Sequence, residues 1–218
     1  MVRASGIKRE FGRVYVFDNR DTLHHAKRKR TKRVKRSWTT DDPFLDQLDT
    51  PECCGYSAAH WLVNKPVRQY ADPNGLYQLA KFMDVWAGEN YDGTSVRATM
   101  KVLKLLGFIK EYQWAPNIPT LVANMLETGP ALLGVNWYEG MMEPDSDGVL
   151  NPTGMLVGGH AILADAVDTR KRLIRVKQSW GKRWGQGGRA FITFETMKQL
   201  LEEDGEICVP IETKPTWK

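Results

Sequence analysis

The hydrophobic positions predict helices in the first half of the chain. The stretch 53–63 (CCGYSAAHWLV) is rich in small residues and apolar on most sides, which is typical of a buried helix. Asn64 and the Lys65-Pro66 pair would end it, because the residue before a proline avoids helical backbone angles. A second helix is expected over 74–86.

The clearest helical signal follows Thr94 and Ser95, either of which can cap a helix. Gly107 supplies a stop, since glycine readily adopts the left-handed conformation that ends many helices. One face of the segment between them is apolar, and its members are Val96, Met100, Leu103 and Leu106. The spacing predicts a third amphipathic helix.

After Pro116 the pattern changes from helix to strand. One more helix is expected at 118–127, followed by apolar or alternating runs at 130–137, 160–167, 172–178 and 189–194. Helices first and strands later, without regular alternation, predict an α+β protein of two lobes with a cleft between them. The helical lobe would cover 38–115 and the β-rich, barrel-like lobe 116–212, with a tail at 213–218.

The N-terminal part, 1–37, is expected to be an extension of this body, whose packed part would begin near Phe44. Within it, 11–17 (FGRVYVF) has the composition of a short strand. The basic run 27–36 holds eight of the 31 lysines and arginines; outside it 23 basic residues face 26 acidic ones, a net charge of −3. The run could bind an acidic protein surface or nucleic acid, or could be a solvated, extended arm. It lacks the interleaved aromatic residues of a single-strand binder.

Composition excludes several classes of protein. With 218 residues, 42% hydrophobic and 26% charged, the chain is neither wholly disordered nor collagenous. No apolar run is long enough for a membrane span, and the charged start lacks a secretory signal, so a cytoplasmic protein is expected. Three cysteines (Cys53, Cys54 and Cys208) without a CxxC motif indicate neither a disulfide framework nor a metal site, and no cofactor is expected.

Cys53 is the first candidate for chemistry. It stands at the start of the predicted 53–63 helix, where the helix dipole and free backbone N–H groups favour a thiolate. Buried free cysteines are mostly inert, so its position alone is weak evidence that Cys53 is a nucleophile.

The cysteine does not stand alone, and the set of motifs around it resembles the papain-like cysteine peptidases. Gln47 precedes Cys53 by six residues, and Cys54, Gly55 and Tyr56 follow it. The family's histidine matches His160 in GGHA, and its Asn-Ser-Trp-Gly element matches Gln178-Ser179-Trp180-Gly181 within a WGxxWGxxG pattern. Further details, GTSVR at 93–97 and NWYEG at 136–140, resemble compact members from bacteria and their phages.

The resemblance implies roles for individual residues. Cys53 would be the nucleophile, His160 the general acid and base, and Gln178 the residue that orients His160. Gln47 would donate to the oxyanion. Gly93 and Gly159 would contact the substrate and Trp180 would shield the histidine. Gly93 could equally be a turn glycine before a helix, and the alternative for Trp180 is an ordinary core tryptophan.

The chain departs from the family pattern in two ways. The gaps from Cys53 to His160 and Gln178 are 107 and 125 residues, shorter than the ~130–150 typical of papain. The third catalytic position holds glutamine instead of asparagine, which places the amide one methylene further out and would weaken activity.

Two functions are therefore considered: a cysteine peptidase acting on peptides or proteins, and a structural or scaffolding protein that keeps the fold but not the turnover. The second could belong to a phage assembly, so a virion location is considered beside the host cytoplasm. A nucleic-acid-binding accessory protein is a third, weaker idea. With 52 residues before Cys53, a large inhibitory prodomain is not expected. The segment 1–37 could instead cross the cleft, dock on a partner or be trimmed.

Overall fold

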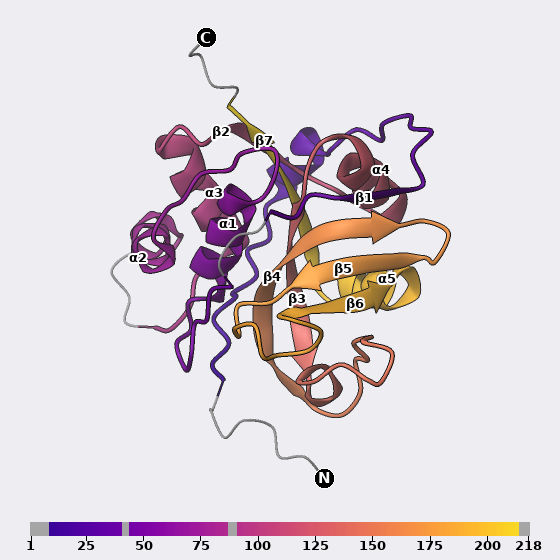
Figure 1. Ribbon diagram of the computed structural model, residues 1–218. Coiled ribbons are helices and arrows are strands. Elements are labelled where there is room, and N and C mark those ends of the chain that lie inside the picture. The colour runs from indigo at the N-terminus through magenta and orange to yellow at the C-terminus, as the bar shows by residue number, and fades with distance from the viewer. Residues whose placement is uncertain (1–8, 41–43, 87–90, 214–218) are drawn as a thin grey trace.

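The computed structural model describes residues 9–40, 44–86 and 91–213, which form a layer of helices packed on an antiparallel sheet (Figure 1). The helical layer consists of α1 (Cys53–Val63), α2 (Pro73–Met83) and α3 (Val96–Leu105). Side chains start two of these helices: Asp72 accepts a hydrogen bond from the Gly75 N–H in α2, and Ser95 accepts one from the Ala98 N–H in α3. Helix α1 is buried along almost its whole length, as its apolar sequence predicts.

The second half of the chain supplies most of the sheet. The strands of the sheet, including one from the N-terminal region, are β1 (Lys35–Ser37), β2 (Ile109–Trp114), β3 (Ala131–Tyr138), β4 (Leu156–Asp168), β5 (Leu173–Lys177), β6 (Arg189–Thr193) and β7 (Glu206–Glu212). Their order is β2-β7-β3-β4-β5-β6, with β1 paired to β4 and every pair antiparallel. Among the described strands the sheet ends at β2 and β6 and does not close into a barrel.

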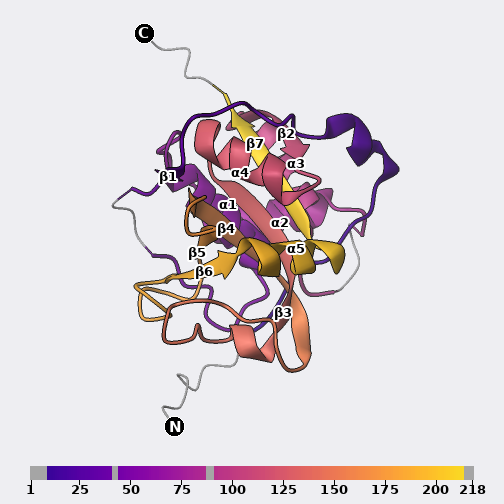
Figure 2. The same cartoon turned by 90° about the vertical axis from the view of Figure 1, so that its right-hand side faces the viewer.

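Two further helices, α4 (Ile118–Glu127) and α5 (Phe194–Glu202), lie together on the sheet face opposite to α1 and α2 (Figure 2). Two short 3₁₀ helices, Asn19–His24 and Glu139–Met141, complete the elements. The sheet therefore has two apolar cores. One, with Trp61, Met100 and Leu163, lies on the side of α1–α3; the other, with Met125 and Val135, lies beneath α4 and α5. Burial on both faces fixes β3 and β4 firmly at the centre of the molecule.

The sequence predictions for the main elements are confirmed. The four expected helices and four expected strands are present. The expected strand at 11–17 is wrong, because only Arg13 forms an isolated bridge, with Thr94. Three strands and a helix were not predicted from the sequence, namely β1, β2, β7 and α5.

The N-terminal region packs against the body well before Phe44. Ala26 and Trp38 are buried, with the Ala26 N–H bonded to Trp114 O and the Trp38 indole to Met125 O. The basic segment 27–36 follows α4, where Thr31 and Arg33 both bind Glu127. Most of its charged side chains remain exposed, but its backbone is held against the body.

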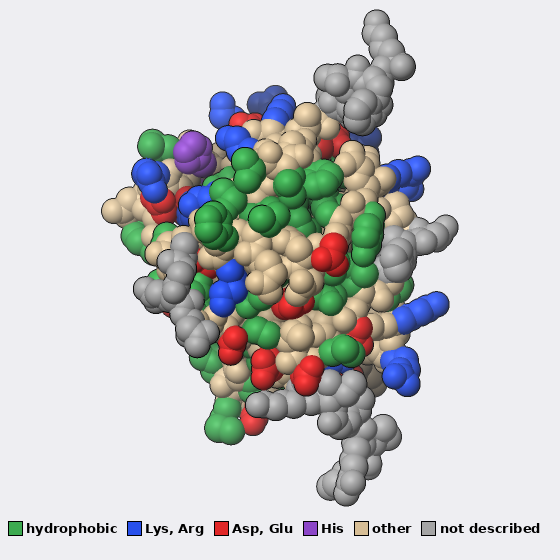
Figure 3. All heavy atoms as spheres, turned by 90° about the vertical axis from the view of Figure 1, so that its left-hand side faces the viewer, with side chains coloured by type: hydrophobic (Ala, Val, Ile, Leu, Met, Phe, Trp, Pro, Cys, Tyr) green, Lys and Arg blue, Asp and Glu red, His purple; other side chains and the backbone are tan. Residues whose placement is uncertain are grey.

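The outer side of the helical layer carries exposed apolar side chains, and hydrophobic groups gather on this face of the molecule (Figure 3). They include Leu79 and Phe82 of α2 and Leu105 of α3. In the part of the chain that the structure describes, no helix has the length and apolar character that a membrane crossing needs.

Candidate active site

Cys53 is the first residue of α1 and is completely buried. The residue before it, Glu52, makes no side-chain cap on the helix; its carboxylate accepts a hydrogen bond from Asn74 Nδ2 at 2.6 Å instead. The first-turn N–H groups and the helix dipole are thus not neutralised by Glu52, and both favour a negative charge at Cys53.

His160 lies on β4 opposite Val135 of β3 and is held by Gln178, which directly follows β5. The distance from His160 Nε2 to Gln178 Oε1 is 2.7 Å. The same oxygen accepts the Ser179 N–H at 2.9 Å, which fixes the amide orientation. A hydrogen bond from Nε2 leaves His160 Nδ1 as the ring nitrogen without a partner among the described residues. Glutamine therefore makes the contact that the resemblance assigns to asparagine.

The surroundings of the two adjacent cysteines separate their pKa values. Burial alone raises the pKa of the Cys53 thiol, but the neighbouring Cys54 and His160 side chains, including the charge of His160, outweigh it and hold that pKa well below its ordinary value. The contact with Cys53, together with burial, raises the pKa of Cys54, whose thiol also donates to Thr94 O at 3.3 Å. Of the two cysteines, Cys53 is therefore the one whose surroundings favour the thiolate.

Two tryptophans enclose the His160 ring. The Trp180 ring lies 5.2 Å from it at a tilt of 30°, and Trp137 meets it edge-on at 4.9 Å. Both indoles are buried, so they exclude water from the contact between His160 and Gln178. Trp137 was missed by sequence reasoning; its position on β3, directly across the sheet from Gly158, is visible only once the strands are paired.

Gln47 is anchored beside this group by both main chain and side chain. Its N–H donates to Ser179 O at 2.8 Å, and its Oε1 accepts from the Ser179 hydroxyl. Its Nε2 donates to Thr50 O at 2.6 Å and to Glu10 O at 3.3 Å. The Glu10 carbonyl of the N-terminal region therefore accepts a hydrogen bond from the Gln47 amide, which the resemblance expects to donate to the oxyanion.

Residues 9–14, called the strap below, run between α1 and β4, where the indigo chain runs upward in Figure 1. Three backbone hydrogen bonds hold the strap: Arg13 N to Gly159 O at 3.0 Å, Thr94 N to Gly12 O at 2.7 Å, and Val14 N to Thr94 O at 2.9 Å. The strap backbone is therefore bonded to Gly159 of β4 on one side and to Thr94 on the other.

Side chains of the strap close over the site. The Phe11 ring meets His160 edge-on at 5.5 Å and Trp180 at 6.1 Å. The Arg9 guanidinium lies over Trp180 and binds Asp46 Oδ1 at 2.7 Å. Residues 9–14 thus lie across His160 and Trp180, whereas docking of the N-terminal segment on a partner and its trimming stay predictions.

The two glycines expected to contact substrate lie along the strap. Gly159 accepts a hydrogen bond from it, whereas the Gly93 N–H donates to the Tyr77 hydroxyl. The backbone groups facing the strap belong to Thr94, one residue later than expected. Gly93 is needed for close approach, because a Cβ there would lie 2.3 Å from Gly12 O, and its φ of +100° also favours glycine.

Other candidates from the sequence have structural roles. His60 is fully buried with a lowered pKa, caused first by burial, and its Nε2 accepts the Leu45 N–H at 3.3 Å. Asp145 accepts the backbone N–H groups of Asp147 and Val149 and so closes a surface turn. Among the described residues, no three His, Cys, Asp or Glu side chains form a metal-binding group.

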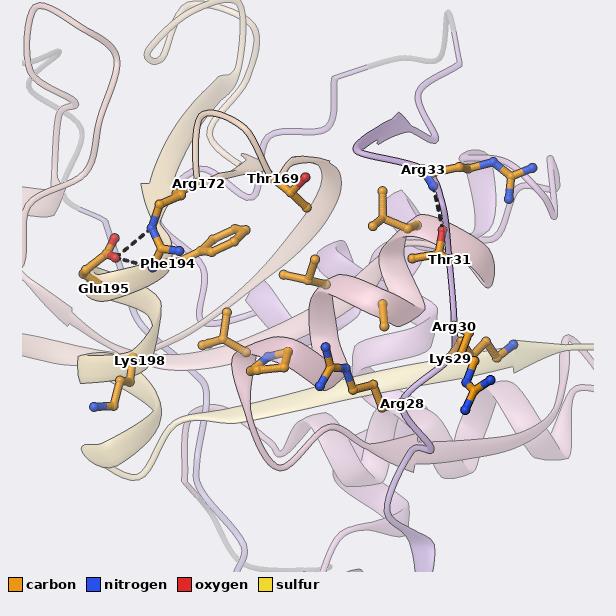
Figure 4. Close-up of a pocket in the computed structure, with 15 residues that line it drawn as sticks. Arg28, Lys29, Arg30, Thr31, Arg33, Thr169, Arg172, Phe194, Glu195 and Lys198 are labelled. Atoms are coloured by element: carbon orange, nitrogen blue, oxygen red, sulfur yellow. Dashed lines mark hydrogen bonds and ion pairs between the residues drawn. The ribbon is translucent and has the colours of Figure 1, made fainter.

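A cavity of about 970 Å³ lies away from Cys53, between the basic segment and helices α4 and α5 (Figure 4). Its floor is apolar, with Ile118 and Val122 of α4 and Phe194 of α5. Arg28 and Arg30 stand on one side, and Arg172 pairs with Glu195 on the other. Binding of an acidic protein or nucleic acid through 27–36 stays a prediction.

No protein-family model and no curated protein matches this sequence. Solved structures do match. Xylellain, a cysteine protease from Xylella fastidiosa, is similar over 98% of this chain and 100% of its own, with a TM-score of 0.76 and 18% identity. The bromelain protease from Ananas comosus in complex with the E64 inhibitor covers 83% of this chain and 100% of its own, with a TM-score of 0.62 and 14% identity.

A third structure, the Carica candamarcensis cysteine protease CMS1MS2 in complex with E-64, matches 84% of this chain and all of its own at a TM-score of 0.61 and 14% identity. These likenesses show that the chain has the papain-like fold, with N-terminal helices and a C-terminal antiparallel sheet. The α+β prediction and the recognition of this fold are thereby confirmed.

Proposed function

We propose that this protein is a cysteine peptidase that hydrolyses amide bonds through a thioester on Cys53. The observation that carries the proposal is the 2.7 Å contact between His160 Nε2 and Gln178 Oε1, which orients the imidazole, beside a cysteine whose pKa is held low by that histidine. A nucleophile, its base and a residue that orients the base form the minimal set for acyl transfer.

Acylation begins when the Cys53 thiolate attacks the substrate carbonyl carbon and forms the C–S bond. The negative charge moves to the carbonyl oxygen, which the Gln47 Nε2–H and the Cys53 N–H stabilise. When the tetrahedral intermediate collapses, the C–N bond breaks and the His160 imidazolium gives its proton to the leaving amine. In deacylation, neutral His160 takes a proton from water, the hydroxyl adds to the thioester, and the Cys53 thiolate leaves.

The form with the strap in place is latent in this proposal. Cys53 and His160 are both completely buried, so a substrate can reach them only after residues 9–14 move. A released form is available by one substitution, Gly12→Ala, because a Cβ on Gly12 would lie 1.8 Å from Pro51 O, a backbone atom. The experiments below use this full-length Gly12→Ala chain.

Gln178 is proposed as a positioning residue for His160. In the released chain, Gln178→Ala is expected to lower kcat/KM for labelled casein by about 10²- to 10⁴-fold, because the imidazole loses its orientation. Gln178→Asn keeps an amide carbonyl on a shorter side chain and is expected to stay within about tenfold of the parent. Equal rates for Gln178→Ala and the parent would contradict the role, and rescue by asparagine distinguishes it from a merely structural one.

A papain-fold protein that binds without turnover is the alternative, and the docked basic segment with its adjoining cavity is the observation that favours it. That function predicts an acidic ligand whose affinity falls steeply with salt. Under this alternative, reversing Arg28 and Arg30 to glutamate would abolish such binding, and no casein hydrolysis would be detected with or without these substitutions. Location in a cytoplasm or a virion stays a prediction.

A further inference from the structure

The basic segment 27–36 is fastened to the body along α4, although its eight positive charges repel one another. Side-chain hydrogen bonds hold it at four positions, and the pairs are Lys27 O with Asn124 Nδ2, Thr31 and Arg33 with Glu127, and Arg36 with the Leu126 carbonyl. A freely solvated arm of like charges would need no such anchors. The fold therefore holds a row of cations in fixed positions beside a helix.

The cavity between this segment and helices α4 and α5, called the basic cavity below, carries more positive charge than the protein neutralises (Figure 4). Its charged lining residues are Arg28, Lys29, Arg30, Arg33, Arg172, Lys198 and one acidic residue, Glu195. Acidic partners are present for three of the cations, in the pairs Arg33–Glu127, Arg172–Glu195 and Lys198–Glu202. Within the described part of the chain, Arg28, Lys29 and Arg30 form no ion pair, and all three are exposed. An anionic ligand would complete their pairing.

The floor of the basic cavity is aliphatic. Ile118 and Val122 of α4 line it, and each keeps 9% of its surface exposed. An ionised group placed against this surface would lose water without gaining a hydrogen bond, whereas an apolar group would gain from burial there. The ligand is thus expected to combine negative charges with an apolar side chain.

Nucleic acid matches the basic cavity less well than polypeptide does. Phe194, the aromatic residue of its lining, is covered on one face by the Arg172 guanidinium, whose carbon lies 5.2 Å from the ring centroid. That face is therefore not available for stacking on a base. Glu195 also lines the cavity and would repel an evenly charged phosphate backbone, whereas the spaced carboxylates of a polypeptide can avoid it.

The cations stand on two sides of the aliphatic floor. Arg28 and Arg30 belong to the basic segment, and Arg172 and Lys198 lie on the side of α5 (Figure 4). A small ligand with one carboxylate would reach one side only. A stretch of polypeptide with several aspartate or glutamate residues can reach both sides and place an apolar side chain between them.

We propose that the basic cavity docks a partner protein through an acidic stretch of its chain that also carries apolar side chains. The contacts that hold the basic segment on α4 prepare the cations for this partner, so little ordering is needed when it binds. The cavity lies away from Cys53, so this docking does not depend on whether the proposed peptidase cleaves a substrate.

The test measures the fluorescence anisotropy of a labelled peptide of Glu-Glu-Leu repeats, about twelve residues long, titrated with full-length Cys53→Ala protein, which removes any turnover. A matched peptide has serine in place of each leucine and the same charge. We expect the leucine peptide to bind about tenfold more tightly than the serine peptide. Its affinity should fall at least about tenfold between ~50 and ~200 mM salt. Equal affinities of the two peptides, or binding that ignores salt, would overturn the proposal.

Protein variants locate the binding site. Arg28→Glu, Arg30→Glu protein is expected to bind the leucine peptide at least about tenfold more weakly. Lys101→Glu, Lys104→Glu protein carries the same change of charge on α3, outside the cavity, and should stay within about twofold of its parent. Equal loss in both variants would show that net charge alone attracts the peptide, and would overturn the cavity as the site.

A labelled DNA strand and its duplex, each of about twelve nucleotides per strand, test the other class of ligand. DNA that binds as tightly as the leucine peptide, and is weakened equally by Arg28→Glu, Arg30→Glu, would assign the cavity to nucleic acid and overturn the proposal. Casein hydrolysis by the Gly12→Ala chain tests the peptidase separately. Docking and peptidase activity can therefore each fail without the other.

Discussion

Replacing Cys53 with alanine in the Gly12→Ala chain is expected to lower casein hydrolysis by about 10⁴- to 10⁶-fold, to the background rate. Cys54 and Cys208, the other described cysteines, both have raised pKa values, so neither is expected to form the thioester in its place. The measurement is the initial rate of release of labelled peptides, together with the mass of the intact protein after a brief reaction. The acyl adduct expected on the Gly12→Ala chain should be absent from its Cys53→Ala variant.

Two other cysteines serve as matched controls for that variant. Cys208 is equally buried on β7, and its pKa is raised by burial, so Cys208→Ala should keep the rate within about twofold. Cys54→Ala removes a contact of Cys53 and is expected to cost less than about tenfold. A full rate in Cys53→Ala, or loss of activity in Cys54→Ala alone, would show that Cys53 is not the nucleophile.

Gly12→Ala itself is expected to raise the rate of casein hydrolysis by about 10²-fold over the natural sequence. The strap is held by three backbone hydrogen bonds, each contributing about 0.5–1.5 kcal/mol, and by Phe11 packed on His160. A closed form favoured by about 2.7 kcal/mol leaves only ~1% of molecules open, so displacement of the strap multiplies the open population by about 10².

Phe17→Ala is the matched control for strap release. Phe17 lies in the same N-terminal region but is 71% exposed, so its loss should leave the rate within about twofold. Thermal unfolding distinguishes release of the strap from general destabilisation of the fold. Release of the strap leaves the buried residues of both apolar cores in place, so the unfolding temperature should change little. If Gly12→Ala and Phe17→Ala hydrolyse casein equally fast, residues 9–14 do not control access.

The parts of the site that sequence alone predicted are those fixed by local pattern. Cys53 begins a helix whose apolar sequence predicts it directly, and His160 opens the buried part of β4. Gln178 follows β5, and the glutamine still reaches the histidine because its Oε1 is also held by Ser179 N–H. Local sequence patterns were therefore enough to predict the helix and strands that carry Cys53, His160 and Gln178, and the positions of these residues on them.

The parts that sequence did not predict depend on contacts between distant segments. The valines and aromatic residues of 11–17 are typical of a strand, yet the strap's backbone hydrogen bonds go to Thr94 and Gly159 and form only an isolated bridge. Glu206 has a cation partner only because Arg13 crosses the cleft. The sequence around Arg13 and the sequence around Glu206 contain no pattern that predicts this contact.

The most direct test of the account is the pH dependence of iodoacetamide alkylation, mapped by mass spectrometry to Cys53 and Cys54 separately. It is run on the Gly12→Ala chain with His160 present and with His160→Ala. Because the pKa of Cys53 is lowered, its thiolate persists as the pH falls below the ordinary thiol value of ~8.5 and is lost only as the pH passes through the lowered pKa. Cys54, whose pKa is raised, should stay unreactive over the same range.

We expect selective alkylation of Cys53 below about pH 7, lost in His160→Ala, where the reaction should move back toward the ordinary thiol pKa. Equal reaction of Cys53 and Cys54, rising only near pH 8.5 and indifferent to His160, would contradict a thiolate held by that histidine and with it the proposed peptidase.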